Sequence, residues 1–276
     1  MREIVVAVDG SEGSLFPALQ VGHELHEQAS VPLRLLSVVD DWGKEERRRR
    51  EIREMLPAGQ AGNPMVGGGD IDVAVAEDDA DHLARCAREQ PDSLLCLATR
   101  GRGAVGSAIL GSVAAAVVRD AQRPILLAGP ELPAEWRGPI LRVVVPLDGS
   151  AAGEAILPDA AAVAEALGVE LRLIQVVEPG SAGGGDTSPE ADAQAYLEEQ
   201  AEALQPRLSR EVSRELLVDS RPATAITDYC AGRGSLVMMS TLGWTGLARL
   251  AMGSVAQAVT REAPFPVAVM CPGEDV

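Results

Sequence analysis

Two glycine-rich segments carry the residues best suited to hold an anionic ligand. One runs from Gly101 to the pair Gly111-Ser112, and the other runs from Gly243 to Gly253-Ser254 with the same spacing. Small residues let the backbone approach a ligand closely, and the free amides at the start of a helix attract phosphate. The same residues also suit an ordinary tight turn followed by a helix cap, so phosphate binding is one of two interpretations.

Two common nucleotide motifs do not fit these segments. Gly106 to Ser112 has the spacing of a P-loop, but no lysine precedes the serine. That lysine reaches the β and γ phosphates, so a P-loop NTPase is disfavoured. The first strand-to-helix turn also lacks G-x-G-x-x-G, which disfavours a dinucleotide-binding Rossmann domain. Ser112 remains as a residue that could cap the following helix or bond a phosphate oxygen.

The chain repeats itself, so each candidate site is expected twice. Asp9-Gly10-Ser11 ends an apolar run near the start, and Asp148-Gly149-Ser150 ends a similar run 139 residues later. The two Gly-Ser pairs lie 142 residues apart. Two copies at nearly constant spacing predict two homologous domains, which we place at residues 1–138 and 139–276.

Each half alternates predicted strands with predicted helices. Apolar, β-branched runs predict strands at 3–8, 33–39, 71–75, 93–98 and 124–128, and again at 141–147, 171–177, 212–218, 235–239 and 266–270. An amphipathic helix is predicted after each Asp-Gly-Ser. Alternation of this kind predicts an α/β fold with two tandem domains, each a five-stranded, mainly parallel sheet with helices on both faces.

Ligands of open α/β sheets bind beyond the carboxyl ends of the strands. The residues that this rule places at the two predicted mouths are Asp9, Val38 and the loop after Ala98 in the first half, and Asp148, Val176 and the loop after Met239 in the second.

The repeated features resemble the universal stress protein family in its tandem-domain form. The family pattern Gly-x2-Gly-x9-Gly-Ser begins at Ala98 in the first half and at Ser240 in the second, each in place of the first glycine. The resemblance covers the whole chain and implies a Rossmann-like fold of the adenine nucleotide alpha hydrolase type. It also implies ATP, with or without Mg²⁺, as a regulatory ligand in bacterial stress response.

The resemblance further implies a role for each set of residues. Asp9 and Asp148 would lie near the ribose and adenine of the nucleotide. The backbone that would assist them lies around Ala7, Val38, Pro146 and Val176. The phosphates would contact Gly101, Gly111, Ser112 and Val113 in the first half, and Gly243, Gly253, Ser254 and Val255 in the second.

The replacement of the first motif glycine by Ala98 and Ser240 leaves the ligand open, because the family contains ATP binders and members that bind no nucleotide. The alternative function is a two-domain interaction scaffold without a nucleotide. Alanine and serine are still small, so they add one Cβ branch without filling the site, provided that the backbone does not need a positive φ there.

Charge distinguishes the two glycine-rich loops. Arg100 and Arg102 lie in the first, whereas Leu242 and Trp244 occupy the same positions in the second. Because arginine forms strong hydrogen bonds with phosphate, we hypothesise that the first half binds ATP better than the second. The alternative is that both arginines face solvent.

Residues for enzymatic chemistry are scarce. His23, His26 and His82 have no counterparts in the second half, and single histidines of this kind are most often surface or core residues. The cluster from Glu77 to Asp81 is typical of a helix start rather than of a metal site. The four cysteines form no C-x-x-C pair. We therefore expect no catalytic or metal site, and at most slow ATP hydrolysis.

The formal net charge of −17 limits the partners of the chain. An acidic protein of this kind is unsuited to non-specific binding of nucleic acid or anionic lipid. Glutamates at helical spacing surround the basic run from Arg47 to Arg50, which we interpret as a solvated helix face rather than a binding patch. Since no basic leader or membrane-length apolar run is found, we expect a cytoplasmic protein without a membrane partner.

The family resemblance also implies that the two halves pair through their last strands. Residues 125–128 and 267–270 would then meet within one chain. Such pairing would cover two sheet edges that otherwise invite aggregation. The chain could remain a monomer or form a homodimer, and the sequence favours neither.

Overall fold

The computed structural model describes residues 1–9, 12–56, 71–99, 110–133, 136, 138–180, 188–242 and 252–273. Within these residues, ten strands form one sheet in the order β3-β2-β1-β4-β5-β10-β9-β6-β7-β8. The first half supplies β1 (Glu3–Ala7), β2 (Leu33–Val39), β3 (Ile71–Val75), β4 (Ser93–Ala98) and β5 (Ile125–Ala128). The second half supplies β6 (Arg142–Leu147), β7 (Glu170–Val177), β8 (Val212–Val218), β9 (Ser235–Ser240) and β10 (Val267–Met270).

The two halves of the sheet have the same internal arrangement. In the first, β1 lies between β2 and β4, and both neighbours run parallel to it. In the second, β6 lies between β7 and β9 in the same manner. The predicted α/β fold with two five-stranded, mainly parallel sheets is therefore confirmed, whereas the exact boundary at residue 138 stays a prediction.

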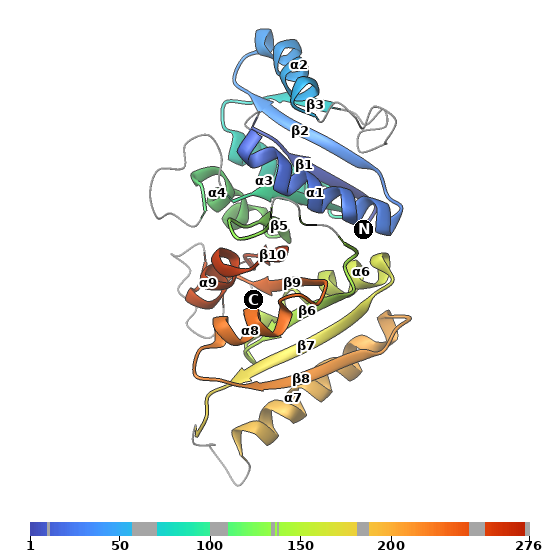
Figure 1. Ribbon diagram of the computed structural model, residues 1–276, viewed down its shortest axis with the longest axis vertical. Helices are drawn as coiled ribbons and strands as arrows, with labels where there is room; N and C mark the ends of the chain where they lie inside the picture. Colours follow the sequence, from blue (N-terminus) through green and yellow to red (C-terminus); the bar gives the residue numbers. More distant parts are fainter. Residues whose placement is uncertain are drawn as a thin grey trace.

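The halves join through β5 and β10, which run antiparallel in the middle of the sheet (Figure 1). Leu126 faces Ala268 in the register, with Ile125 opposite Val269 and Leu127 opposite Val267. All four residues of each strand are buried. The predicted pairing of 125–128 with 267–270 is confirmed, and it leaves β3 and β8 as the outer strands.

Helices cover both faces of this sheet. The first half contains α1 (Glu12–Ala29), α2 (Glu45–Met55), α3 (Asp79–Glu89) and α4 (Ser112–Ala121). The second contains α5 (Ala151–Glu154), α6 (Leu157–Leu167), α7 (Pro189–Leu204), α8 (Pro222–Cys230) and α9 (Ser254–Glu262). Short 3-10 turns occur at η1 (Trp42–Lys44) and η3 (Gln205–Arg207). None of the described helices is long and apolar enough to cross a membrane.

The core consists of two apolar layers, one on each face of the sheet. One layer joins the strands to α1, α2, α6 and α7, and the other joins them to α3, α4, α8 and α9. Neighbouring strand residues alternate between the layers, so Val6 belongs to the first and Val5 to the second. Because each layer contains residues from both halves, the two domains share one continuous core.

One helix differs between the halves. The sequence predicts a single helix after Ser150, but the structure divides it into α5 and α6, with a break at Ala155 and Ile156. Pro158 then lies in the first turn of α6, where its missing N–H costs no hydrogen bond. Pro17 corresponds to Ile156, two residues before Pro158, yet it lies inside the continuous helix α1.

Candidate functional site

A pocket opens in the second half at the carboxyl ends of β6, β7 and β9. Its volume is about 260 Å³, and residues of α8 and α9 complete its walls. The residues predicted for the second site that line it are Pro146, Asp148, Val176, Ser240, Gly253, Ser254 and Val255. Gly243, the remaining residue predicted there, lies outside the described residues. The structure thus brings the described part of the second predicted site together around one cavity.

The carboxylate of Asp148 is held in place by the turn that follows β6. Its Oδ1 accepts a hydrogen bond from Ser150 N at 3.0 Å and another from Ser150 Oγ at 2.6 Å. Ser150 Oγ in turn accepts from Gly153 N at 3.0 Å and so caps α5. A Cβ atom on Gly153 would lie only 2.7 Å from Asp148 Oδ1, so this close approach requires glycine.

The start of α9 forms another wall of the pocket. Gly253 is the N-cap residue, so no side chain satisfies the amides of the first turn from the cap position. Gly253 N donates to Thr241 O at 2.6 Å, which closes the loop between β9 and α9. The amide dipoles at this helix start favour a negative charge.

Ser240 ends β9 and Thr241 follows it, and the two residues play different roles in the pocket wall. Ser240 Oγ accepts from Leu242 N at 3.3 Å, which fixes the turn after the strand. Thr241 is 1% exposed, and its Oγ1 has no hydrogen-bond partner among the described residues. A buried hydroxyl without a partner costs free energy, so Thr241 is a candidate ligand contact that our sequence reasoning missed. Its repeat counterpart, Thr99, is the signal that could have identified it.

The first half has the same framework at the ends of its strands. β1 pairs with β2 and β4, which brings Ala7, Val38 and Ala98 to one edge of the sheet. Gly111 N donates to Thr99 O at 2.7 Å, as Gly253 does to Thr241 in the other half. Arg100, Gly101 and Arg102 lie outside the described residues. The hypothesis that rests on the two arginines therefore stays a prediction.

Ser112 does not cap α4, which corrects one of its two predicted roles. Gly111 is the N-cap residue of this helix and has an extended backbone, so Ser112 is already the first helical residue. The turn into the helix therefore occurs one residue earlier than expected. Ser112 and Val113 are both exposed at this helix start.

An arginine supports Asp9 in a way that the sequence analysis did not predict. Arg48 Nη1 donates to the backbone oxygen of Asp9 at 2.6 Å and lies 3.4 Å from Ser37 Oγ. Arg47 and Arg49 of the same run behave as predicted, since they pair with Glu51 and Glu46 of the same helix. Arg48 also pairs with Glu51 of its helix, but its side chain is only 15% exposed and additionally joins α2 to the end of β1.

Electrostatic environments also differ between the two mouths. Burial, and then the charge of Asp78, raises the pKa of the Asp79 carboxyl, while Arg48 opposes this shift. In the second half, Tyr196 of α7 donates to Glu154 Oε1 at 2.9 Å. Burial and this hydrogen bond raise the pKa of the Tyr196 hydroxyl, so it stays protonated. The cation of Arg48 therefore supports the backbone of Asp9, whereas the neutral Tyr196 hydroxyl binds Glu154 of α5.

Comparison with known proteins gives the family of the chain. The model of the universal stress protein family matches residues 1–128 and 139–270. The universal stress protein Rv1996 of Mycobacterium tuberculosis is 30% identical over 196 residues, which cover 68% of this chain and 61% of that protein. Rv2005c of the same organism is 31% identical over 183 residues, or 64% of this chain and 61% of that protein. This chain thus spans less than two thirds of the length of these relatives.

A solved structure shows the same fold over almost the whole chain. A universal stress protein from Archaeoglobus fulgidus has a TM-score of 0.63 and 20% identity, with 98% of each chain covered. With the family model matching both halves, this chain belongs to the universal stress protein family and carries two of its domains in tandem.

Proposed function

We propose that this chain binds an adenine nucleotide, with ATP as the first candidate, as a regulatory ligand. The observation that carries the proposal is the pocket of the second half. It combines an anchored carboxylate at Asp148, a buried hydroxyl without a partner at Thr241 and an uncapped helix start at Gly253. These groups suit the hydroxyl, polar and anionic parts of a nucleotide, respectively.

The walls of the pocket match the apolar part of such a ligand. Val176, Ile226 and Met239 offer hydrocarbon surface to a flat base. The Asp148 carboxylate can accept hydrogen bonds from ribose hydroxyls, and a charged acceptor forms stronger hydrogen bonds than a neutral one. The volume lies just below the usual range of roughly 300–1,000 Å³ for ligand pockets, so it suits a nucleoside better than a bulky cofactor.

The first half has a matching framework, which supports a nucleotide site there as well. Asp9, Ala98 and Gly111 have the same places in the repeat as Asp148, Ser240 and Gly253. The hypothesis that this half binds ATP better depends on Arg100 and Arg102 and stays a prediction. A count of nucleotides bound per chain, followed by the same count in Asp9→Asn and Asp148→Asn, distinguishes one site from two.

The first test is to identify what the purified protein carries. Acid precipitation of freshly purified protein, followed by chromatography of the supernatant, would release and identify a bound nucleotide. The stripped protein is then titrated with ATP by calorimetry, once with Mg²⁺ and once with EDTA. A released adenine nucleotide or saturable ATP binding supports the proposal, and the EDTA arm shows whether Mg²⁺ takes part.

Regulation requires that the nucleotide change the state of the protein. A ligand that binds only the folded form raises the unfolding temperature in proportion to the logarithm of its concentration. If the protein releases no nucleotide and binds none at millimolar ATP, the nucleotide-binding proposal is wrong. The two-domain scaffold would then be the remaining function, and light scattering would show whether it acts as a monomer or a homodimer.

A further inference from the structure

Two histidines and a glutamate gather on the C-terminal part of α1, away from the nucleotide pocket. His26 and Glu27 come three and four residues after His23, so each is a neighbour of His23 on the helix surface. One donor atom from each of the three lies within 4.8 Å of the other two. The two imidazole rings are 5.9 Å apart between centroids. This trio is independent of the proposed nucleotide function.

The hydrogen bonds of His26 leave two acceptors facing each other. Its Nδ1 forms a short hydrogen bond with Val31 O, and a carbonyl oxygen can only accept, so Nδ1 carries the proton. In the neutral ring, Nε2 then presents a lone pair. Glu27 Oε1 lies 3.3 Å from that Nε2. Two acceptors at this distance repel each other unless Nε2 takes up a proton or a cation binds between them.

His23 provides a third metal-binding side chain, and one of its ring nitrogens is not used in a hydrogen bond among the described residues. Its Nδ1 is buried and has no partner among the described residues. A buried polar nitrogen without a partner costs free energy, which coordination of an ion can recover. Two imidazoles and one carboxylate are also the protein ligands of open zinc sites, where water completes the coordination.

We propose that His23, His26 and Glu27 bind a divalent transition-metal ion of the zinc type. The side chain of Glu27 is 56% exposed, so an ion can enter from solvent and keep water in its remaining positions. The bond from His26 Nδ1 to Val31 O acts as the outer-shell contact that orients a metal-binding imidazole and fixes its tautomer. All three ligands come from one helix, so binding needs only side-chain adjustment.

The position of the trio gives the ion a structural consequence. Gln28, the next residue, donates to Ile140 O at 2.7 Å and thereby contacts the second half of the chain. An ion held by His23, His26 and Glu27 would stabilise the last turn of α1, from which Gln28 reaches across. We expect Zn²⁺ to raise the unfolding temperature of the full chain, because it binds the folded form.

The test is a calorimetric titration of tag-free full chain with Zn²⁺ at neutral pH. We expect one ion per chain, and His23→Gln and Glu27→Gln should each weaken binding by about tenfold or more. His82→Gln is the matched control, because His82 is a partly exposed histidine of α3 that contacts Arg85. Glu27→Gln changes an exposed residue, so the metal-free variant should fold as the wild type does.

Cobalt distinguishes this site from the free thiols of the chain. Cys86 and Cys271 are partly exposed and offer soft ligands to the same metals. Co²⁺ held by nitrogen and oxygen donors lacks the near-ultraviolet thiolate absorption that cysteine ligands produce. Absence of Zn²⁺ binding, binding that survives both His23→Gln and Glu27→Gln, or a thiolate band with Co²⁺ would each overturn the proposal.

Discussion

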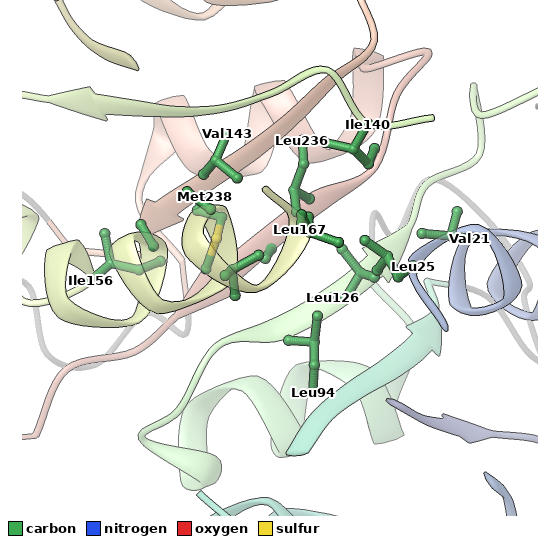
Figure 2. Packing of buried hydrophobic residues seen from close by; sticks show 14 of the residues in the cluster. Val21, Leu25, Leu94, Leu126, Ile140, Val143, Ile156, Leu167, Leu236 and Met238 are labelled. Carbon is green, nitrogen blue, oxygen red and sulfur yellow. The ribbon is translucent and has the colours of Figure 1, made fainter. Parts of the chain in front are cut away.

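One side-chain amide, that of Gln28, pairs both backbone groups of Ile140 in the other half of the chain. Gln28 Nε2 donates to Ile140 O at 2.7 Å, and Gln28 Oε1 accepts from Ile140 N at 2.9 Å. The same Nε2 lies 3.3 Å from Leu167 O at the end of α6. Figure 2 shows Leu25 and Leu126 of the first half beside Ile140 and Leu167 of the second. The α1–α6 contact therefore joins the domains in addition to the β5–β10 pairing.

Removal of this amide should destabilise the whole chain. Gln28→Ala would leave the backbone N–H and C=O of fully buried Ile140 without their partner. We expect a loss of about 1–3 kcal/mol in the free energy of unfolding, measured by urea denaturation. Gln90→Ala is the control, because the side-chain amide of exposed Gln90 pairs with Arg34 rather than with a buried backbone group, so the substitution should change stability by less than about 0.5 kcal/mol. Equal effects of the two substitutions would show that the Gln28 contact is unimportant.

An ion pair between the halves makes stability depend on pH. Arg123 Nη2 lies 2.9 Å from Asp159 Oδ1, and burial raises the pKa of Asp159 above 3.8 even though Arg123 opposes the shift. The folded state therefore holds the Asp159 proton more tightly than the unfolded state. The stability that this proton contributes is complete below the unfolded pKa and is lost as pH rises through the folded pKa.

Asp159→Asn removes that titration while it keeps an acceptor for Arg123. The free energy of unfolding of the variant, minus that of the wild type, should increase as the pH rises from about 4 towards neutral. Urea denaturation at a series of pH values measures this difference. A difference that stays constant or decreases over the same range would contradict a raised pKa at Asp159.

The close contact between Gly153 and Asp148 predicts a selective effect on ligand binding. Gly153→Ala places a Cβ 2.7 Å from Asp148 Oδ1 and must displace the carboxylate from the pocket wall. We expect ATP affinity at the second site to fall by about tenfold, which corresponds to about 1.4 kcal/mol. Gly273→Ala is the matched control, since its Cβ would meet the nearest atom at an ordinary 3.5 Å. Unchanged affinity in Gly153→Ala would remove Asp148 from the site.

The unpartnered hydroxyl of Thr241 predicts opposite effects with and without nucleotide. Thr241→Val keeps the shape of the side chain but removes a buried hydroxyl, so the nucleotide-free protein should become slightly more stable. ATP affinity should fall because the ligand loses a hydrogen bond. Thr227→Val provides the control, because Thr227 Oγ1 is also buried without a partner among the described residues, outside the pocket lining. Both variants should gain stability, whereas only Thr241→Val should weaken ATP binding.

Much of the fold could be predicted because the repeat and the apolar runs encode it directly. The bounds of β3, β4 and β8 are those that the sequence predicts. Strands with apolar residues on both faces must lie inside a covered parallel sheet, which accounts for the correct fold class. The break between α5 and α6 was missed, because Pro17 lies inside α1 while Pro158 lies in the first turn of α6, and local sequence does not distinguish these outcomes.

Only those site residues whose location follows from their position in a strand could be predicted from the sequence. Asp148 and Val176 line the pocket because the carboxyl ends of neighbouring parallel strands meet. Contacts between distant elements could not be predicted, such as the one between Arg48 of α2 and the backbone of Asp9. Burial of a single hydroxyl, as at Thr241, also depends on packing that no local pattern reports.

The most direct measurement of the central claim is calorimetric titration of ATP into the stripped wild type, Asp9→Asn and Asp148→Asn. We predict saturable binding by the wild type, with the second site weakened about tenfold or more in Asp148→Asn, because the ribose loses a charged acceptor. Asp9→Asn should leave that second site intact and affect only binding to the first half. Absence of ATP binding by the wild type, or equal binding by the wild type and Asp148→Asn, would contradict the account.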